Sequence, residues 1–498
     1  MGKILIHQLC FVIISTWSLS LAKAQQAQCA CDYVIKTSGV YQSKDINPLP
    51  GSTICIQAGT YDRLKFIGFA GDSTKPLRFV NLGGRVVLKS LTAVNALEFT
   101  DCRHFIISGG GQKDLKYGFV AGASYKDITA VHVNGKSSNF EIERIEVNEA
   151  GFAGLMIKAD PTCDSTTWRS HFTMANVHVH DNYIHDVAGE GMYIGNSFWG
   201  QGQARTCAGQ SVRVLPHNIL KLHIHHNLVE RTGCEGIQIG CAPDFDVHHN
   251  IVRTAGIKPF TADQDNGVQI GGGAGGKLHH NYFEDAQDVG LIIVGHLGDL
   301  MVANNAVINS KGVGVFCDER TGSLPNVNVR FINNTFINTG EDGFRLYNET
   351  QKNSLINNVI VNINTKNSTD PFKYISFGQQ AKAEEMNNVT TQTVASLKFL
   401  DQAIGNFRLT AGSPLIDKGT DVSSLGITSD LADRVRPQGA GFDIGAFEFG
   451  EQQAIAPTLV ATTCETASKP NTITLQPGVK APPWRLLQRL KNRAERLR

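Results

Sequence analysis

The hydrophobic pattern of this chain consists of short alternating runs, each closely followed by an asparagine. A five-residue phrase, with asparagine third and two mostly apolar residues after it, recurs along the middle of the chain. The shortest interval between two such asparagines is 23 residues, and longer intervals fit the same unit with an added loop. This self-similarity predicts a repeat fold. The repeated asparagines are Asn182, Asn227, Asn250, Asn281, Asn305, Asn334 and Asn358.

A second signature follows the phrases after a short turn, where a glycine begins a β-rich run. These glycines are Gly154, Gly191, Gly236, Gly267, Gly290, Gly314 and Gly343. The pattern contains short strands and no amphipathic helix of useful length. One such unit cannot bury its apolar side alone, so the units must stack and share a core. We therefore predict an all-β fold, a right-handed parallel β-helix over residues 25–449.

Asparagine suits this repeat because it tolerates a left-handed bend and its amide can bond the equivalent residue one coil away. We expect a ladder of stacked amides that satisfies buried polar groups. Histidine pairs beside the ladder, such as His225 with His226, look like a metal array. The second histidine gives way to asparagine in later coils, at Asn304, Asn333 and Asn357. We therefore interpret the histidine pairs as structural.

Aligning the repeats on their glycines places polar residues in columns about 4.8 Å apart. The residue before glycine contributes Glu190, Glu235 and Asn266, and the second residue after it contributes Tyr193, Gln238 and Gln269. This stack predicts a sugar-binding groove, or a pair of carboxylates, Glu190 and Glu235, that holds calcium or exchanges protons. An ordinary solvated outer face is the alternative.

A further column, just beyond each strand, carries charged residues in turns. It holds Lys158 with Asp160, and in later coils His296, Asp318 and Arg320. Binding residues concentrate on turns held by a rigid scaffold, so these are candidate site residues. An exposed charged turn is the other interpretation of residues 318–320.

Two long insertions, at 159–179 and 196–217, could form walls beside these columns. They carry Trp168 and Trp199, whose rings suit the apolar faces of sugars, although a packing role explains them equally well. Cys163 and Cys207 could join the two insertions. Cysteine spacing fits no usual zinc pattern, so we expect disulfides or buried thiols.

The ends of the chain differ from the repeat. A charged start, a short apolar centre and the small-x-small pattern at residues 22–24 predict a signal peptide over residues 1–24. We therefore expect a secreted, periplasmic or cell-surface protein, a monomer with no stable membrane span. The net charge of +1 gives no reason to expect a nucleic-acid partner. Residues 450–498 are predicted to be a linker and a poorly ordered basic tail.

The segments at both ends of the repeat look like the ends of a β-helix. Residues 51–61 and 75–80 look like first coils, and residues 406–417 and 443–448, the latter reading Asp-Ile-Gly-Ala-Phe-Glu, look like a terminal cap. With these segments, residues from about 30 to 449 resemble the right-handed parallel β-helix proteins of the pectin-lyase-like superfamily. That superfamily includes lyases, glycosidases, epimerases and non-catalytic adhesins, so the resemblance implies the fold and leaves the reaction open.

Our leading hypothesis for function is a carbohydrate-active protein with a polysaccharide partner, a lyase that cleaves a uronate-containing glycan. Lys158 or Arg320 would then act as base or neutralise the substrate carboxylate, and Glu190 with Glu235 could hold a calcium ion. No lyase motif matches residue by residue. The alternatives are a glycoside hydrolase, using Glu190 with Glu235 or Asp318, and a non-catalytic glycan-binding surface protein.

Overall fold

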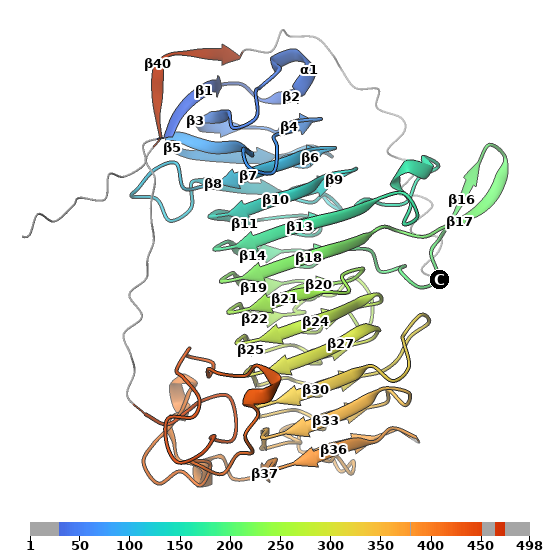
Figure 1. The fold of residues 1–498 in the computed structure, drawn as a ribbon, viewed down its shortest axis with the longest axis vertical. Coiled ribbons are helices and arrows are strands. Elements are labelled where there is room, and N and C mark those ends of the chain that lie inside the picture. The colour runs from blue at the N-terminus through green and yellow to red at the C-terminus, as the bar shows by residue number, and fades with distance from the viewer. Residues whose placement is uncertain (1–28, 379, 451–463, 474–498) are drawn as a thin grey trace, which may run out of the picture.

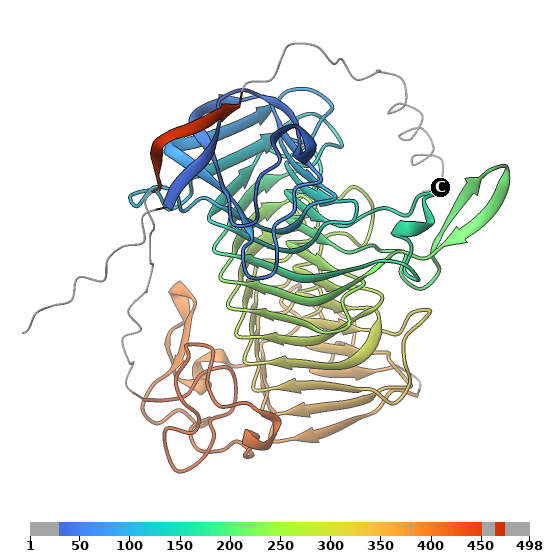
Figure 2. The same cartoon turned by 45° about the horizontal axis from the view of Figure 1, so that its top comes forward.

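The computed structural model describes residues 29–378, 380–450 and 464–473, which form a tall stack of coils (Figures 1 and 2). The strands pair in parallel from coil to coil, as predicted for a right-handed parallel β-helix. The predicted signal peptide and the basic end of the chain lie outside the described residues. Within the described ranges, no helix combines the length and the apolar character needed to cross a membrane.

One wall of the solenoid is a sheet of twelve strands, here called the short sheet. Each of these strands begins at or just after the repeat glycine in the coils where that signature occurs. The strands, in spatial order, are β2 (Gly39–Gln42), β4 (Leu64–Ile67), β6 (Leu97–Thr100), β9 (Val131–Asn134), β12 (Leu155–Ile157), β15 (Met192–Ile194), β20 (Ile237–Ile239), β23 (Val268–Ile270), β26 (Leu291–Ile293), β29 (Val315–Cys317), β32 (Phe344–Leu346) and β35 (Ile375–Phe377).

The other walls belong to a sheet of 24 strands, here called the long sheet, which bends at the asparagine ladder. The strands that precede the bend form its leading row. They are β1 (Cys29–Ile35), β3 (Thr53–Tyr61), β5 (Leu77–Ser90), β7 (Arg103–Ser108), β10 (Ser138–Glu143), β13 (Thr173–His180), β18 (Asn218–His225), β21 (Phe245–His248), β24 (Ala274–His279), β27 (His296–Ala303), β30 (Asn328–Ile332), β33 (Lys352–Ile356) and β36 (Ala383–Met386).

The strands that follow the bend form the trailing row of the long sheet. They are β8 (Phe119–Ala123), β11 (Ile145–Asn148), β14 (Tyr183–Val187), β19 (Leu228–Thr232), β22 (Ile251–Ala255), β25 (Tyr282–Glu284), β28 (Ala306–Ile308), β31 (Thr335–Ile337), β34 (Val359–Val361) and β37 (Val389–Thr391). The long strand β5 contributes to both rows, because it pairs with β7 through its first half and with β8 through its second.

The remaining elements decorate the solenoid. An antiparallel hairpin, β16 (Gln203–Cys207) with β17 (Gln210–Val214), projects from its side (Figure 1). The pair β38 (Phe399–Asp401) and β39 (Asn406–Leu409) belongs to the C-terminal region. The helices are single turns: α1 (Ser43–Ile46) and the 3₁₀ helices η1 (Ser165–Thr167), η2 (Val394–Leu397), η3 (Gln402–Ile404) and η4 (Ser423–Leu425).

The core runs along the axis because alternate residues of every strand point inward. In the leading row, Ile142, Val179, Ile224 and Val247 lie on successive coils, and each is at most 1 % exposed. Aliphatic side chains that stack in this way bury apolar surface against both neighbouring coils. This continuous core fixes the register, so the residues between these positions must point outward.

The predicted asparagine ladder is present, and it includes one rung that the sequence pattern did not supply. The Nδ2 of each ladder asparagine donates to the Oδ1 of the next at 2.9–3.0 Å, from Asn182 as far as Asn388. The left-handed backbone, however, belongs to the residue before the ladder asparagine, as at His226 (φ 55°), His249 (φ 54°) and Asn304 (φ 53°). Histidine and asparagine are enriched in this conformation, which explains their exchange there.

The histidine pairs stack into two columns on the outer surface. The rings of His225, His248 and His279 stack at centroid distances of 4.9 and 5.1 Å, and those of His226, His249 and His280 do the same. Within each pair the two Nδ1 atoms lie 2.7–2.9 Å apart, which is a hydrogen bond between neighbouring rings. The second column also contacts the C-terminal region, through Asp433 at 2.9 Å from His249.

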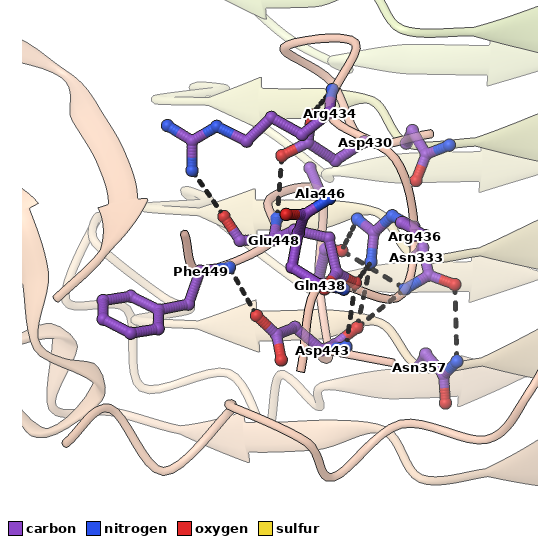
Figure 3. A network of polar contacts seen from close by, with 12 residues as sticks. Asn333, Asn357, Asp430, Arg434, Arg436, Gln438, Asp443, Ala446, Glu448 and Phe449 are labelled. Atoms are coloured by element: carbon purple, nitrogen blue, oxygen red, sulfur yellow. Dashed lines mark hydrogen bonds and ion pairs between the residues drawn. The ribbon is translucent and has the colours of Figure 1, made fainter. Parts of the chain in front are cut away.

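The expected terminal cap lies alongside the last coils and packs on the long sheet (Figures 1 and 3). Its centre is a fully buried ion pair in which Arg436 Nη1 lies 2.9 Å from Glu448 Oε1. The residues that directly precede two of the ladder asparagines hold the cap in place. Asn333 Nδ2 donates to the Asp443 carbonyl at 2.9 Å, and Asn357 Nδ2 donates to another carbonyl of the cap. The Asp-Ile-Gly-Ala segment therefore joins the cap to the bend.

Part of the predicted C-terminal linker forms a strand. Residues 464–473 make β40 (Cys464–Ile473), which pairs in parallel with β1 at the opposite end of the solenoid from the cap. This strand was not predicted, because the segment lacks the repeat of asparagine and glycine.

Candidate functional site

The outward positions of the short sheet bring together the predicted polar stack. Met156, Tyr193, Gln238 and Gln269 are register partners on β12, β15, β20 and β23. The Tyr193 hydroxyl lies 2.7 Å from the Ser197 hydroxyl, to which Gln238 Nε2 also donates at 3.0 Å. Tyr193 and Gln238 are almost fully buried, whereas Ser197 is exposed. Ser197 thus links the stack to solvent.

Lys158 lies directly beyond β12, and its ammonium group is the centre of this region. Its side chain is 7 % exposed, and Nζ lies 3.0 Å from Asp160 Oδ1 and 4.2 Å from the centroid of the Tyr193 ring. Asn196 Nδ2 also donates to Asp160, at 3.1 Å. The carboxylate and the aromatic face both favour a positive charge, which offsets the cost of burying it. We infer that Lys158 is a fixed cation.

The adjacent coil adds further polar groups that the sequence alignment missed. His132 on β9 is the register partner of Met156, and its Nε2 lies 3.4 Å from the Lys158 carbonyl. Burial lowers the pKa of His132, so the imidazole is neutral at pH 7. Its Nδ1 lies 3.1 Å from Asn134, which in turn donates to Glu98 at 2.9 Å. His132 could have been found by continuing the strand frame one coil earlier than Gly154.

Glu190 and Glu235 lie next to one another at the opposite end of the strands from Lys158. Their adjacency matches the predicted column, since Gly154 N donates to the Glu190 carbonyl and Gly191 N donates to the Glu235 carbonyl. Both residues are buried, at 2 % and 0 % exposed. Burial first, and then the charge of Glu190, raises the pKa of Glu235 to about 8. The interpretation as a solvated outer face therefore does not hold for these two side chains.

The calcium hypothesis fits this pair poorly. Calcium takes six to eight oxygen ligands and usually keeps water among them. The neighbouring amide of Asn266 turns its nitrogen toward Glu235, with Nδ2 at 3.2 Å from Oε1. A buried carboxyl group with a raised pKa beside a donor amide suits a protonated acid better than a ligand of a hydrated divalent ion. We therefore assign calcium no part in the chemistry of this site.

Aromatic residues cover the Glu190 end of the site. Phe152 packs edge-on against Tyr193 at a centroid distance of 6.2 Å and stacks on Phe260 at 5.8 Å. Phe260 comes from the loop between β22 and β23, and it also approaches Gly189. The alignment could have identified Phe152, since this residue lies two positions before the repeat glycine Gly154. The position of Phe260 depends on the path of its loop.

The structure does not bring Arg320 and Asp318 to Lys158. Arg320 is 58 % exposed beyond β29 and lies 3.8 Å from Asp318. Five strand spacings separate β12 from β29, which places the two regions roughly 24 Å apart along the axis. Of residues 318–320 only Arg320 is exposed, whereas Asp318 and Glu319 are half-buried. A direct role for both Lys158 and Arg320 on the same sugar unit is excluded by this separation.

His296 also differs from its expected place on a binding edge. It is 1 % exposed, with Nε2 3.8 Å from Cys317 Sγ, and burial lowers its pKa to about 4. A neutral histidine that is enclosed in this way packs inside the coil and has no surface for a polymer. The frame placed it correctly along the chain, but its side chain points inward.

The two long insertions form a side arm held by the disulfide Cys163–Cys207, whose S–S distance is 2.09 Å. Trp168 Nε1 donates to the Thr162 carbonyl within the arm. Trp199 lies 4.1 Å from the Arg169 guanidinium, packs against Gly273 and donates to Asn218. These contacts give both tryptophans a packing role. A second disulfide joins Cys31 to Cys55, while Cys234 and Cys241 are buried free thiols.

The comparisons with known proteins concern the fold. The profile described as a right handed beta helix region matches residues 258–374. A solved pectate lyase is 13 % identical, with 85 % of this chain and 98 % of that chain covered and a TM-score of 0.43. A lacto-N-biosidase from Eubacterium ramulus is 10 % identical, with coverages of 73 % and 67 % and a TM-score of 0.43.

An alginate lyase from Paenibacillus is 12 % identical, with 72 % of this chain and 98 % of that chain covered and a TM-score of 0.33. No curated protein matches the chain. The continuous parallel strands, the asparagine ladder and the matching profile agree on one conclusion. In its fold, the chain is a right-handed parallel β-helix protein.

Proposed function

We propose that this protein is a carbohydrate-active enzyme that cleaves an acidic polysaccharide by β-elimination at the outer face of the short sheet. The observation that carries the proposal is the environment of Lys158. A buried ammonium group is held 3.0 Å from Asp160 and 4.2 Å from the Tyr193 ring centroid, beside a tyrosine hydroxyl that reaches exposed Ser197. A fixed cation next to two groups that can exchange protons is what β-elimination from a uronate requires.

Each residue has one role in the proposed elimination. Lys158 neutralises the substrate carboxylate, which makes the proton on C5 acidic. Asp160, whose side chain is 60 % exposed, accepts that proton. The electron pair left on C5 forms the C4–C5 double bond, the bond from C4 to the glycosidic oxygen breaks, and the Tyr193 hydroxyl donates its proton to the leaving oxygen. Gln238 and Gln269, on the next two coils, would hydrogen-bond neighbouring sugar units.

The test is the appearance of an unsaturated, ultraviolet-absorbing product from alginate, pectate or glycosaminoglycan. We expect one polymer class to be cleaved, and Lys158→Met to lower the rate at least about 100-fold, because the charge that stabilises the transition state is lost. His248→Asn on the long sheet is the matched control and should leave the rate unchanged. Absence of product from all three polymers, or a Lys158→Met variant as active as the wild type, would contradict the proposal.

One observation favours a second candidate, a glycoside hydrolase. Glu235 holds its proton at neutral pH beside Glu190, which is the state that a general acid needs. Reducing ends without unsaturated product, lost in Glu235→Gln, would select this reaction. Binding to a glycan array without turnover, unaffected by Lys158→Met and Glu235→Gln, would identify a non-catalytic binding protein.

A further inference from the structure

A second cluster of ionisable side chains lies on the outer face of the leading row, away from the short sheet. Glu141 and Glu143 are two residues apart on β10, so both point outward while Phe140 and Ile142 fill the core. On the next coil, His180 at the end of β13 is the register partner of Glu143. The β-helix backbone therefore fixes two carboxylates and one imidazole on neighbouring strands.

The ligand atoms of these three residues have the spacing of a metal site. One carboxylate oxygen from each glutamate and one nitrogen of His180 all lie within 4.8 Å of one another. His180 Nε2 lies 3.1 Å from Glu141 Oε1. Two ligands bound to zinc at about 2.0–2.1 Å in a tetrahedral arrangement lie about 3.3 Å apart. Little movement would be needed to place an ion between them.

Neighbouring side chains form hydrogen bonds that hold the three residues in place, as is usual around metal ligands. His180 Nδ1 lies 2.8 Å from Asp181 Oδ2, which leaves Nε2 directed at the glutamates. Metal-binding histidines commonly donate their other ring N–H to a carboxylate in this way. Glu143 is held from its far side by the Ser108 hydroxyl at 2.5 Å. Asp181 is fixed in turn by the left-handed bend before Asn182 (φ 55°).

We propose that Glu141, Glu143 and His180 bind a divalent transition-metal ion, for which zinc is the best match. One nitrogen and two carboxylate oxygens are ligands that zinc takes, and they leave a fourth position for water. The Glu141 side chain is 35 % exposed, so the ion and its water would be reached from solvent. The site lies on a different sheet from Lys158 and is independent of the proposed lyase activity.

A similar group of a histidine, the aspartate after it and a glutamate lies on the trailing row, but a nearby arginine makes it unsuitable for a metal ion. His185 is also followed by an aspartate, with Nδ1 2.6 Å from Asp186, and its Nε2 lies 3.5 Å from Glu146. There, however, Arg231 forms an ion pair with Asp186 at 2.8 Å. A guanidinium at this position neutralises the carboxylate and repels a cation. On the leading row, Arg78 is the register partner of Ile106, which pairs with Glu141, so this guanidinium lies two strands away from the cluster.

The test is calorimetric titration of zinc into the full chain after chelator treatment. We expect one site per chain, weakened at least about 100-fold in Glu143→Gln and in His180→Ala. Asp181→Asn should weaken it about 10- to 100-fold, because only the supporting hydrogen bond changes. Asparagine is tolerated at this bend, so this variant should fold normally. His185→Ala is the matched control and should bind zinc as the wild type does.

Three outcomes would overturn the proposal. The first is the absence of binding at micromolar zinc by the folded wild-type protein. The second is unchanged binding in Glu143→Gln, which has nearly the same shape as the wild type. The third is binding that is lost in His248→Asn but kept in Glu143→Gln, which would assign the ion to the histidine columns. Circular dichroism of each variant confirms folding, and lyase activity measured in parallel separates this site from the short sheet.

Discussion

The outer face of the short sheet and the outer face of the leading row share one backbone frame but differ in the burial of their polar residues. On the short sheet, Lys158 and Tyr193 are enclosed by neighbouring side chains and the loops beside them. On the leading row, His180 and the glutamates of β10 are half-buried and remain in contact with solvent. The register determines which side chains are neighbours, and the loops determine which of them solvent can reach.

The largest effect we expect comes from the ladder that both faces share. Asn281→Ala removes hydrogen bonds to the carbonyls of Val247 and His279 and to Asn305, all in a fully buried position. Leaving these groups unpaired should lower the free energy of unfolding by about 4 kcal/mol. Urea denaturation measures it. Asn338→Ala, which removes two part-buried amide bonds, one donated to Asn309 and one accepted from Asn362, should cost about 2 kcal/mol. Equal losses of unfolding free energy in the two variants would contradict the prediction that the ladder stabilises the fold more than other asparagine pairs.

The second prediction separates the chemistry of the two faces. Tyr193→Phe keeps the ring beneath Lys158 and removes the hydroxyl that bonds Ser197. We expect the elimination rate to fall about 100-fold, the usual contribution of a proton donor, with zinc affinity unchanged. Steady-state kinetics on the cleaved polymer measures it. Ser197→Ala should cost less than about tenfold. A Tyr193→Phe variant with wild-type kcat would remove Tyr193 from the mechanism.

The third prediction uses the raised pKa of Glu235, which is about 8. Because the folded state keeps this proton between the ordinary pKa of 4.5 and 8, the stability from Glu235 is lost as the pH rises through that window. Glu235→Gln should match the wild type at pH 5 and be about 2 kcal/mol more stable at pH 9. Chemical denaturation at both pH values measures it. Exposed Glu349→Gln should change neither, and a pH-independent difference for Glu235→Gln would contradict the assignment.

The smallest effect belongs to the histidine columns. Burial, followed by the neighbouring His279 and His249, lowers the pKa of His280 to about 3, although Asp433 opposes this and Arg436 reinforces it. The neutral ring therefore contributes its full stability above about pH 6.5, and that stability is lost as the pH falls toward 3.

His280→Asn places at this bend the residue that the next coil has, Asn304. The variant should lose about 1 kcal/mol less stability than the wild type between pH 7 and pH 4.5. Denaturation midpoints at the two pH values test this. Exposed His171→Asn serves as the control. An identical acid response in His280→Asn and the wild type would show that the columns do not resist protonation.

The frame of asparagine and glycine was sufficient to predict the β-helix and the alignment of Tyr193, Gln238 and Gln269. These features follow from a local repeat that each coil obeys. The left-handed residue was misplaced by one position, because an asparagine in a ladder and an asparagine in a bend look alike in sequence. His296 was aligned correctly but faces inward, since alternation breaks where a strand begins.

The features that the sequence did not predict depend on contacts between distant segments. Phe260 covers the site from a loop whose length, but not whose path, is visible in the spacing of Asn250 and Asn281. Arg320 shares a column with Lys158, yet five coils separate them. The Glu141 and His180 cluster escaped notice because alignment on the glycine compares residues of the short sheet only.

The pairing of β40 with β1 has a consequence for self-association. The first coil of a solenoid presents an unpaired strand edge, which invites a strand from another molecule. In this protein residues 464–473 occupy that edge, so the chain shields its first coil with its own later sequence. A chain that stopped after the cap would keep the solenoid and the site intact but expose β1, and such molecules would add to one another end to end.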